Sequence, residues 1–158
     1  MAIHLRPLTA EDGEAAAAIF FDAVHRGTAD VYSAAQRRAW AGAAPSPTRW
    51  RKRFADVSGV AAEVNGEMAG FMTLDTAGHI DLAFVRSDLS GRGVGRAIYD
   101  RIEARARADG IARLTTEASK KAKPFFARLG WQVDAEQTVV KDGIRLTNFR
   151  MSKPLVSE

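Results

Sequence analysis

The spacing of hydrophobic positions predicts a helical first third of the chain and a mixed remainder. A short strand is expected over residues 3–8, where Ile3 and Leu5 alternate with polar neighbours. Apolar residues at helical spacing then predict three helices, over residues 9–24, 32–43 and 47–54. Pro47 suits the first turn of the last of these helices, because a proline lacks only an N–H that would be unpaired there.

From residue 57 onward the hydrophobic period changes to that of strands. Asn65-Gly66, a strong hairpin signal, joins the first two expected strands. A third strand, nearly continuous in apolar residues, is expected to be central. The predicted elements are strands over 57–64, 68–74 and 80–85, a helix over 93–108, a strand over 111–116, a helix over 119–129, and strands over 131–133 and 144–151. This order predicts a mixed α/β sheet, with a parallel strand pair in the second half.

Composition narrows the class of protein. The chain has 158 residues, of which 46% are hydrophobic, and it contains no cysteine. This length suits one ordinary domain, and the apolar fraction excludes a disordered chain. Without cysteine there is no disulfide framework, no thiolate metal site and no cysteine nucleophile. Residues 14–24 are too few for a membrane span, and residues 1–7 lack the order of a signal peptide. We therefore expect a cytoplasmic protein with no membrane partner.

The formal net charge of +4 is concentrated in one segment. Residues 86–128 contain 11 basic and 5 acidic residues, whereas the rest of the chain contains 12 basic and 14 acidic residues. This concentration favours an anion bound at that segment, and a solvated, arginine-rich helix face is the alternative. The pI of about 9.8 could also indicate nucleic-acid binding. The sequence contains no recognition helix or RNA-binding signature, so no nucleic-acid partner is expected.

A glycine-rich run lies between an expected strand and an amphipathic helix: Ser90-Gly91-Arg92-Gly93-Val94-Gly95-Arg96. Glycines let a backbone approach a ligand closely, and a helix start offers unpaired N–H groups. Together they predict a phosphate cradle, to which Arg92 and Arg96 add charge. The run matches neither the P-loop nor the dinucleotide-binding pattern. A tight turn without a ligand remains the alternative.

The segment over residues 84–97 resembles the acetyl-CoA loop of the GNAT N-acetyltransferase superfamily. Gly93 and Gly95 occupy the glycine positions of the family pattern Gln/Arg-x-x-Gly-x-Gly/Ala, whereas Ser90 departs from its first position. A second stretch, residues 119–131, resembles the family's Asn-x-x-Ala-x-x-Phe-Tyr-x-x-x-Gly-Phe. The end of the chain, residues 146–153, resembles a bacterial subgroup of uncharacterised acetyltransferases.

The resemblance implies a GNAT-like fold, with a central, mostly antiparallel sheet, flanking helices and a splayed parallel strand pair ending near Val85 and Thr116. It implies a single domain over 1–158, with an acceptor side over 1–56, an acetyl-CoA-binding core over 57–131 and C-terminal strands over 132–158. The implied reaction moves an acetyl group from acetyl-CoA to a primary amine of a small molecule or peptide, by direct attack in a ternary complex and without a metal. The implied acetyl-CoA contacts are Ala83, Phe84, Val85, Ser90, Gly91, Arg92, Gly93, Val94, Gly95, Arg96, Ser119, Ala122, Phe125 and Phe126.

The candidate catalytic residues are His79 and Asp81, which alternate in the strand entering the expected site. Either could take the proton that an alkylammonium must lose before it attacks. The alternative places His79 at a turn edge and has Asp81 hold the substrate ammonium. Glu117 is a weaker candidate. Phe126 stands where the family often has a tyrosine acid, so the proton donor to the thiolate is unassigned.

The candidate acceptor-binding residues are His25, Tyr32 and Trp40, in the early helices, where Tyr32, Gln36 and Trp40 share one face. Aromatic rings suit an amine through cation–π contact, although core packing explains the tryptophans equally well. The basic run over residues 49–53 either forms a solvated helix face or attracts an acidic substrate. The alternative function is a non-catalytic acyl-CoA-binding module or sensor. The sequence does not identify the acceptor, and a homodimer is an expected state because dimers are common in the family.

Overall fold

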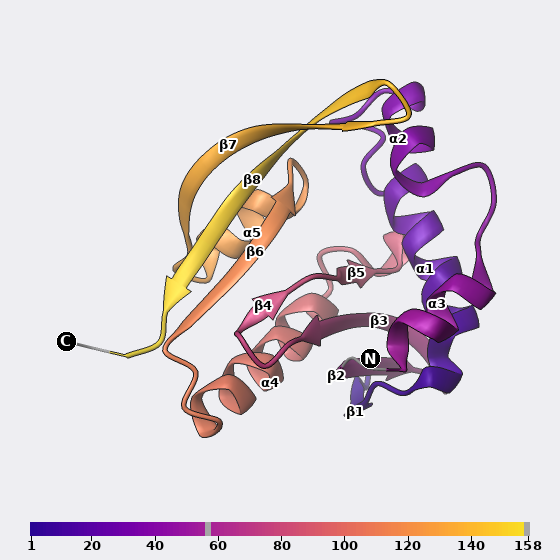
Figure 1. Ribbon diagram of the computed structural model, residues 1–158. Helices are drawn as coiled ribbons and strands as arrows, with labels where there is room; N and C mark the ends of the chain where they lie inside the picture. The colour runs from indigo at the N-terminus through magenta and orange to yellow at the C-terminus, as the bar shows by residue number, and fades with distance from the viewer. Residues whose placement is uncertain (56–57, 157–158) are drawn as a thin grey trace.

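The protein is represented by a computed structural model that describes residues 1–55 and 58–156 (Figure 1). Its strands are β1 (His4–Pro7), β2 (Ser58–Val64), β3 (Glu67–Leu74), β4 (His79–Ile80), β5 (Ala83–Val85), β6 (Arg113–Ser119), β7 (Gln132–Lys141) and β8 (Ile144–Pro154). Its α-helices are α1 (Gly13–His25), α2 (Ala34–Ala41), α3 (Pro47–Phe54), α4 (Val94–Ala108) and α5 (Ala122–Arg128). Two single-turn 3-10 helices are η1 (Ala10–Asp12) and η2 (Ser87–Leu89).

The strands form two four-stranded sheets. The N-terminal sheet has the order β1-β2-β3-β5, and the C-terminal sheet has the order β4-β6-β8-β7. Every neighbouring pair is antiparallel except β4 and β6, which are parallel. Figure 1 shows the two sheets diverging from this pair. The predicted fold class, a mixed α/β arrangement that is mostly antiparallel with one parallel pair, is confirmed.

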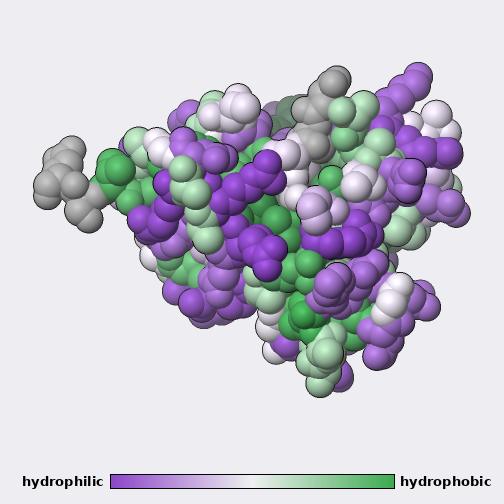
Figure 2. All heavy atoms as spheres, turned by 90° about the horizontal axis from the view of Figure 1, so that it is seen from below, coloured by the Kyte–Doolittle hydropathy of each residue, from purple (hydrophilic) through white to green (hydrophobic). Residues whose placement is uncertain are grey.

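Helices cover both faces of the N-terminal sheet. On one face Trp50 and Phe54 of α3 pack on Phe71 of β3, together with residues of α1. On the other face α4 inserts the apolar stripe expected from its sequence, Val94, Ile98, Ile102 and Ala106, each at most 1% exposed. On the face seen from below in Figure 2, hydrophilic residues predominate, and hydrophobic residues show between them and at the edge. Burial of these apolar faces is the main force that holds helices and sheet together.

Local signals in the sequence account for several boundaries. Ser33 Oγ accepts a hydrogen bond from the N–H of Gln36 at 3.1 Å, and the Gln36 side chain accepts one from the N–H of Ser33 at 2.8 Å, so a capping box starts α2. Pro47 stands in the first turn of α3, as predicted. The Asn65-Gly66 turn joins β2 to β3, also as predicted.

The predicted continuous strand over residues 80–85 is wrong. It is divided into β4, in the C-terminal sheet, and β5, in the N-terminal sheet, with Asp81 and Leu82 between them. Two hydrogen bonds hold the break against β3. The N–H of Leu82 donates to Thr73 Oγ1 at 3.1 Å, and the carbonyl of Leu82 accepts from the N–H of Thr73 at 3.0 Å. These bonds move the chain from one sheet to the other.

Other boundaries also differ from the predictions. The strand predicted over 131–133 is the ten-residue β7, whose mostly polar outer positions hid its length, and its ladder with β8 extends to Lys141. The helices predicted over 32–43 and 119–129 are shorter, because Ser33 caps the first and Ser119 still belongs to β6. The predicted strand start at residue 57 lies outside the described residues.

Candidate active site

A V-shaped opening begins where β4 and β6 stop pairing. The parallel ladder joins His79 to Thr115 and Ile80 to Thr116, and the Thr116 hydroxyl donates to the carbonyl of Ile80 at 2.7 Å. Beyond that bond β6 continues in the C-terminal sheet, whereas the chain after Asp81 joins the N-terminal sheet. Figure 1 shows that β5 and β6 diverge beyond this point. Ligands of such sheets bind where neighbouring strands diverge in this way.

One wall of the opening is the free edge of β5. Phe84 pairs directly with Phe71, and bonds to β3 flank it at Leu82 and Arg86. Because backbone groups alternate in direction along a strand, the N–H and carbonyl groups of Ala83 and Val85 point away from β3, toward the opening. An extended chain containing amide groups can add to such an edge as one more strand.

The glycine-rich run forms a cradle at the start of α4. Gly93 has a φ of 90°, in the left-handed region, and a Cβ built there would meet nothing within 4 Å. The first backbone bond of α4 runs from the N–H of Ala97 to the carbonyl of Gly93 at 3.0 Å. The N–H groups of residues 94–96 therefore precede the helical ladder and are free to bind an anion. The open space and these donors suit a bound phosphate group.

The arginines around the cradle differ in their partners. Arg96 Nε contacts Asp100 Oδ1 at 2.9 Å, one turn further along α4. Within residues 1–55 and 58–156 the structure gives Arg92 no ion pair, and this side chain is exposed beside the cradle. Arg92 is thus the better placed of the two predicted arginines to meet an added anion without breaking an existing contact.

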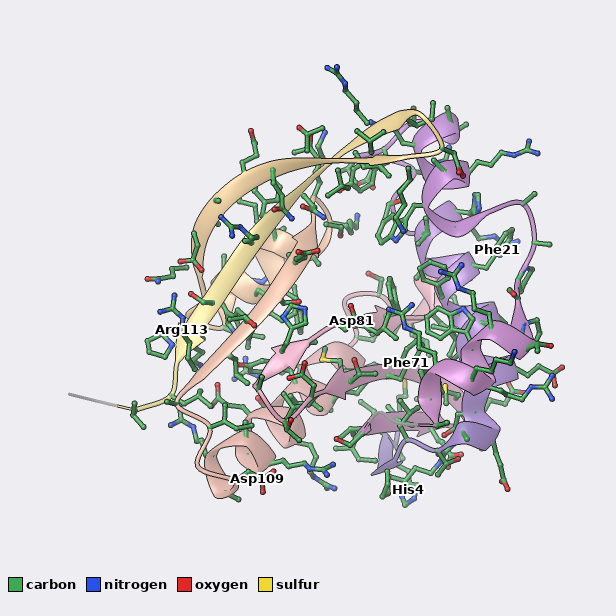
Figure 3. The ribbon with its side chains drawn as sticks, in the orientation of Figure 1. His4, Phe21, Phe71, Asp81, Asp109 and Arg113 are labelled. Carbon is green, nitrogen blue, oxygen red and sulfur yellow. The ribbon has the colours of Figure 1, made fainter. Side chains whose placement is uncertain are left out.

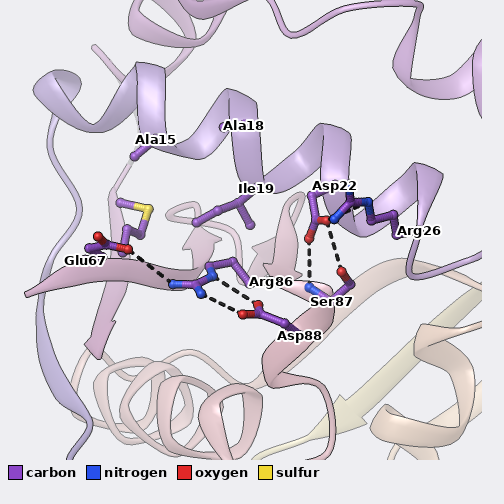
Figure 4. A pocket seen from close by; sticks show the side chains of 10 residues that line it. Ala15, Ala18, Ile19, Asp22, Arg26, Glu67, Arg86, Ser87 and Asp88 are labelled. Atoms are coloured by element: carbon purple, nitrogen blue, oxygen red, sulfur yellow. Dashed lines mark hydrogen bonds and ion pairs between the residues drawn. The ribbon is translucent and has the colours of Figure 1, made fainter. Parts of the chain in front are cut away.

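Asp22, a residue that sequence reasoning missed, anchors the chain at the start of the cradle. One carboxylate oxygen accepts the backbone N–H of Ser87 at 2.8 Å, and the other accepts the Ser87 hydroxyl at 3.0 Å (Figure 4). These bonds tie η2 to α1 beside a cavity of about 480 Å³, which α1 and β3 also line. Nothing in the helical pattern of α1 distinguishes this aspartate from a solvent-facing one.

The far wall comes from β6 and α5. Ser119 Oγ accepts the N–H of Ala122 at 3.0 Å and so fixes the start of α5. The Phe125 ring lies against the cradle, because a Cβ added to Gly95 would be 3.3 Å from it. Phe126 turns inward instead: it is 1% exposed, and its ring centroid is 4.8 Å from that of Trp131. Of the two phenylalanines with a predicted cofactor contact, Phe125 adjoins the cradle and Phe126 belongs to the core.

The two candidate catalytic residues contact different elements. The His79 ring Nδ1 is 2.8 Å from the Thr115 hydroxyl on β6, before the opening begins. Asp81, labelled in Figure 3, lies at the break between β4 and β5 and forms an ion pair with Arg53 of α3. The structure thus brings Asp81, but not His79, toward the helices of the expected acceptor side.

Asp81 also lines a cavity of about 510 Å³, here called the acceptor cavity. It is enclosed by α1, α2, α3, the loop between α2 and α3, the Asp81-Leu82 break and the tip of the β7–β8 hairpin. Its lining residues are Phe20, Arg38, Ala39, Trp40, Ala41, Gly42, Ala44, Pro45, Ser46, Arg49, Trp50, Arg53, Asp81, Leu82, Lys141 and Asp142. The contribution of the hairpin tip has no signal in the local sequence.

Only one of the three predicted acceptor-binding residues lines this cavity, and that residue is Trp40. Tyr32 is 4% exposed, and its hydroxyl donates to the carbonyl of Thr147 at 2.5 Å and accepts the N–H of Lys120 at 3.0 Å. Burial raises the pKa of Tyr32 above its usual range. His25 contacts the carbonyl of Gly42 at 2.8 Å through Nε2. Tyr32 and His25 therefore hold elements together around the cavity.

The sequence is similar to a known protein family and to two curated proteins. The sequence profile of the acetyltransferase (GNAT) domain family matches residues 28–153. The chain is 33% identical over 149 residues, covering 94% of both sequences, to the uncharacterised N-acetyltransferase YafP of Escherichia coli K12. It is 28% identical over 142 residues, covering 88% of this chain and 90% of the relative, to the peptidyl-lysine N-acetyltransferase YjaB of Salmonella typhimurium LT2.

Solved structures show the same fold. A GCN5-related N-acetyltransferase from Rhodopseudomonas palustris superposes with a TM-score of 0.90 at 37% identity, over 98% of this chain and 97% of that one. The PaiA N-acetyltransferase of Thermoplasma acidophilum, solved in complex with coenzyme A, superposes with a TM-score of 0.77 at 17% identity, over 98% and 99% of the two chains.

The fold, the cradle and these matches define an acetyltransferase of the mixed α/β type. The chain belongs to the GNAT acetyltransferase family. It is an N-acetyltransferase, as the resemblance of its two motifs implied. Among residues 1–55 and 58–156, no helix combines the length and apolar character needed to cross a membrane. The same residues contain no group of three or more His, Asp or Glu side chains arranged to hold a metal ion.

Proposed function

We propose that the protein transfers the acetyl group of acetyl-CoA to the primary amine of a small molecule or peptide, by direct attack while both substrates are bound. The observation that carries this proposal is the position of Asp81. It lines the acceptor cavity and stands two residues before Ala83, whose backbone is free at the edge of β5. An amine entering from the cavity therefore meets a carboxylate beside the donor edge. The absence of cysteine from the sequence also favours direct attack, because no thiol is present to carry the acetyl group.

The residues that would hold acetyl-CoA lie along one continuous path. The free backbone groups of Ala83 and Val85 pair with the pantetheine arm, and the N–H groups of the cradle over residues 90–96 bind the pyrophosphate. Ser119, Ala122 and Phe125 form the opposite wall. Acetyl-CoA supplies a thioester. A C–N bond to the amine forms as the C–S bond of the thioester breaks. The substrate ammonium loses two protons, of which one ends on the sulfur and the other in the solvent. A backbone N–H near Val85 polarises the acetyl carbonyl.

Asp81 takes the first proton from the ammonium, directly or through one water molecule. Its ion pair with Arg53 is exposed, so an incoming ammonium can compete for the carboxylate. His79 is the second candidate, and its separation from the acceptor cavity makes it the weaker one. The chain has two tyrosines, Tyr32 and Tyr99, and the hydroxyl of each is engaged in hydrogen bonds. We therefore assign protonation of the departing thiolate to solvent.

The test measures thiol release from acetyl-CoA with a panel of primary amines. Intersecting initial-velocity lines are expected for a ternary complex, and parallel lines would contradict direct attack. Asp81→Asn should lower kcat/KM by about 100-fold or more, the usual contribution of a general base, without changing the Kd for acetyl-CoA measured by calorimetry. His79→Gln should change kcat/KM by only a few-fold. If Asp81→Asn keeps full activity while His79→Gln loses it, the assignment of the base is wrong.

A further inference from the structure

The acceptor cavity carries an excess of positive charge. Its lining includes four cationic side chains, from α2, α3 and the β7–β8 hairpin: Arg38, Arg49, Arg53 and Lys141. Two carboxylates, Asp81 and Asp142, oppose them. Among residues 1–55 and 58–156 the only ion pair formed within this set joins Arg53 to Asp81. Cationic groups that converge from three separate elements on one cavity concentrate a field that attracts anions.

The Arg53–Asp81 pair is easily opened. The two side chains are 39% and 55% exposed, and exposed ion pairs contribute little to stability because water competes for both charges. The pair nevertheless places a cation and an anion side by side on the cavity wall. A ligand with an ammonium and a carboxylate close together can exchange this internal pair for two intermolecular ones, one with Asp81 and one with Arg53.

The lining of the cavity suits such a ligand. Arginine presents a planar fork that matches a carboxylate, and Arg49 lies on the same helix as Arg53, one turn earlier. The Arg53 guanidinium stacks over the Trp50 ring, with 5.5 Å from Cζ to the ring centroid, which limits where it can point. Phe20, Trp40 and Leu82 give the remaining wall an apolar character.

We propose that the acceptor is a free amino acid, whose α-ammonium group is held by Asp81 and whose carboxylate is held by Arg53, with Arg38 and Arg49 supplying further positive charge. This inference rests on the proposed function, because it names the acceptor of that same site. The acetylated nitrogen is then the α-amine, which faces both the carboxylate of Asp81 and the free edge of β5. A peptidyl lysine lacks a carboxylate beside its amine, so it cannot replace the internal ion pair in this way.

The experiment compares three forms of each acceptor: the free amino acid, its carboxamide, and the amine that lacks the carboxyl group. Thiol release from acetyl-CoA gives kcat/KM for every form, and a lysine-containing peptide is included in the panel. Binding of the best amino acid to the protein saturated with CoA is measured by calorimetry, which does not depend on turnover. The variants are Arg49→Glu in the cavity wall and Lys52→Glu, which makes the same change of charge at an exposed residue of α3 outside the cavity.

For at least one amino acid, kcat/KM should exceed that of its carboxamide by tenfold or more, and the decarboxylated amine should be poorer still. Arg49→Glu should remove most of this preference and weaken amino acid binding at least tenfold, whereas Lys52→Glu should leave both within about twofold. The inference is overturned if carboxamides or the lysine peptide react as well as the free amino acids, or if the two variants have equal effects. If no amine at all increases thiol release, the proposed function itself fails.

Discussion

Gly93, which has a left-handed backbone conformation at the start of α4, offers a test that distinguishes backbone strain from cofactor binding. Gly93 has a φ of 90°, and a Cβ there would meet nothing within 4 Å, so Gly93→Ala adds no clash. The left-handed conformation costs a non-glycine residue about 1–2 kcal/mol. Gly110, at the other end of α4, has a φ of 73° and equally open surroundings. Gly110→Ala is therefore a matched control with the same strain, remote from the cradle.

Gly110→Ala should lose about 1–2 kcal/mol of unfolding free energy, which for a chain of this size lowers Tm by about 2–8 °C. Gly93→Ala should lose less than this, because its open loop can relax out of the strained conformation. Only Gly93→Ala should weaken acetyl-CoA binding, because the altered loop relaxes and binding must restore the conformation that presents its N–H groups. The same 1–2 kcal/mol corresponds to an increase of about 5- to 30-fold in Kd, measured by calorimetry. An unchanged Kd for Gly93→Ala, or an equal increase for Gly110→Ala, would refute the assignment of the cradle.

Three further predictions concern the supports of the site. Asp22→Ala should raise the KM for acetyl-CoA several-fold with little change in kcat, because Ser87 loses both of its bonds to α1; an unchanged KM would remove Asp22 from the positioning residues. Tyr99→Phe should lower the unfolding free energy in urea by about 2–4 kcal/mol, since it deletes bonds to Glu103 and Trp131 and leaves a buried indole N–H unpaired; a loss below 1 kcal/mol would contradict this. Burial raises the pKa of Glu103 and of Asp12, but the hydrogen bonds that each carboxylate accepts together outweigh it. These come from Lys153, Tyr99 and Arg107 for Glu103 and from Arg6 and Thr9 for Asp12, so both pKa values lie below the ordinary 4.5 and 3.8. Their stabilisation is therefore complete above about pH 4.5 and is lost as the pH falls further, which acid titration of Tm would detect.

Local signals predicted the parts of the fold that depend on neighbouring residues. The Asn65-Gly66 turn, the proline that begins α3 and the stripe of α4 all act within a few positions, and the structure contains each of them. The glycine-rich run also predicted a backbone feature, and its donors precede the first bond of α4 as expected. Such features need no knowledge of distant contacts.

Features that depend on distant residues were not predictable. The division of the strand over 80–85 is imposed by Thr73 of β3, whose backbone and side chain bond the intervening Leu82. The apolar run looked continuous because Ile80, in β4, and Leu82, at the break, are both buried. Lys141 reaches the acceptor cavity only because the long β7–β8 hairpin extends to α2. Tyr32 shared a helical face with Trp40 in the sequence, but its hydroxyl is engaged by Thr147.

The β7–β8 hairpin allows the acceptor cavity and the cradle to change independently during evolution. Its tip, at Lys141 and Asp142, belongs to the wall of the acceptor cavity, whereas the cradle and the free edge of β5 lie within residues 83–96. Substitutions or changes of length at an exposed turn are tolerated well by a folded chain. A lineage could therefore change its acceptor by altering a few residues at this tip, while the residues proposed to bind acetyl-CoA stay unchanged.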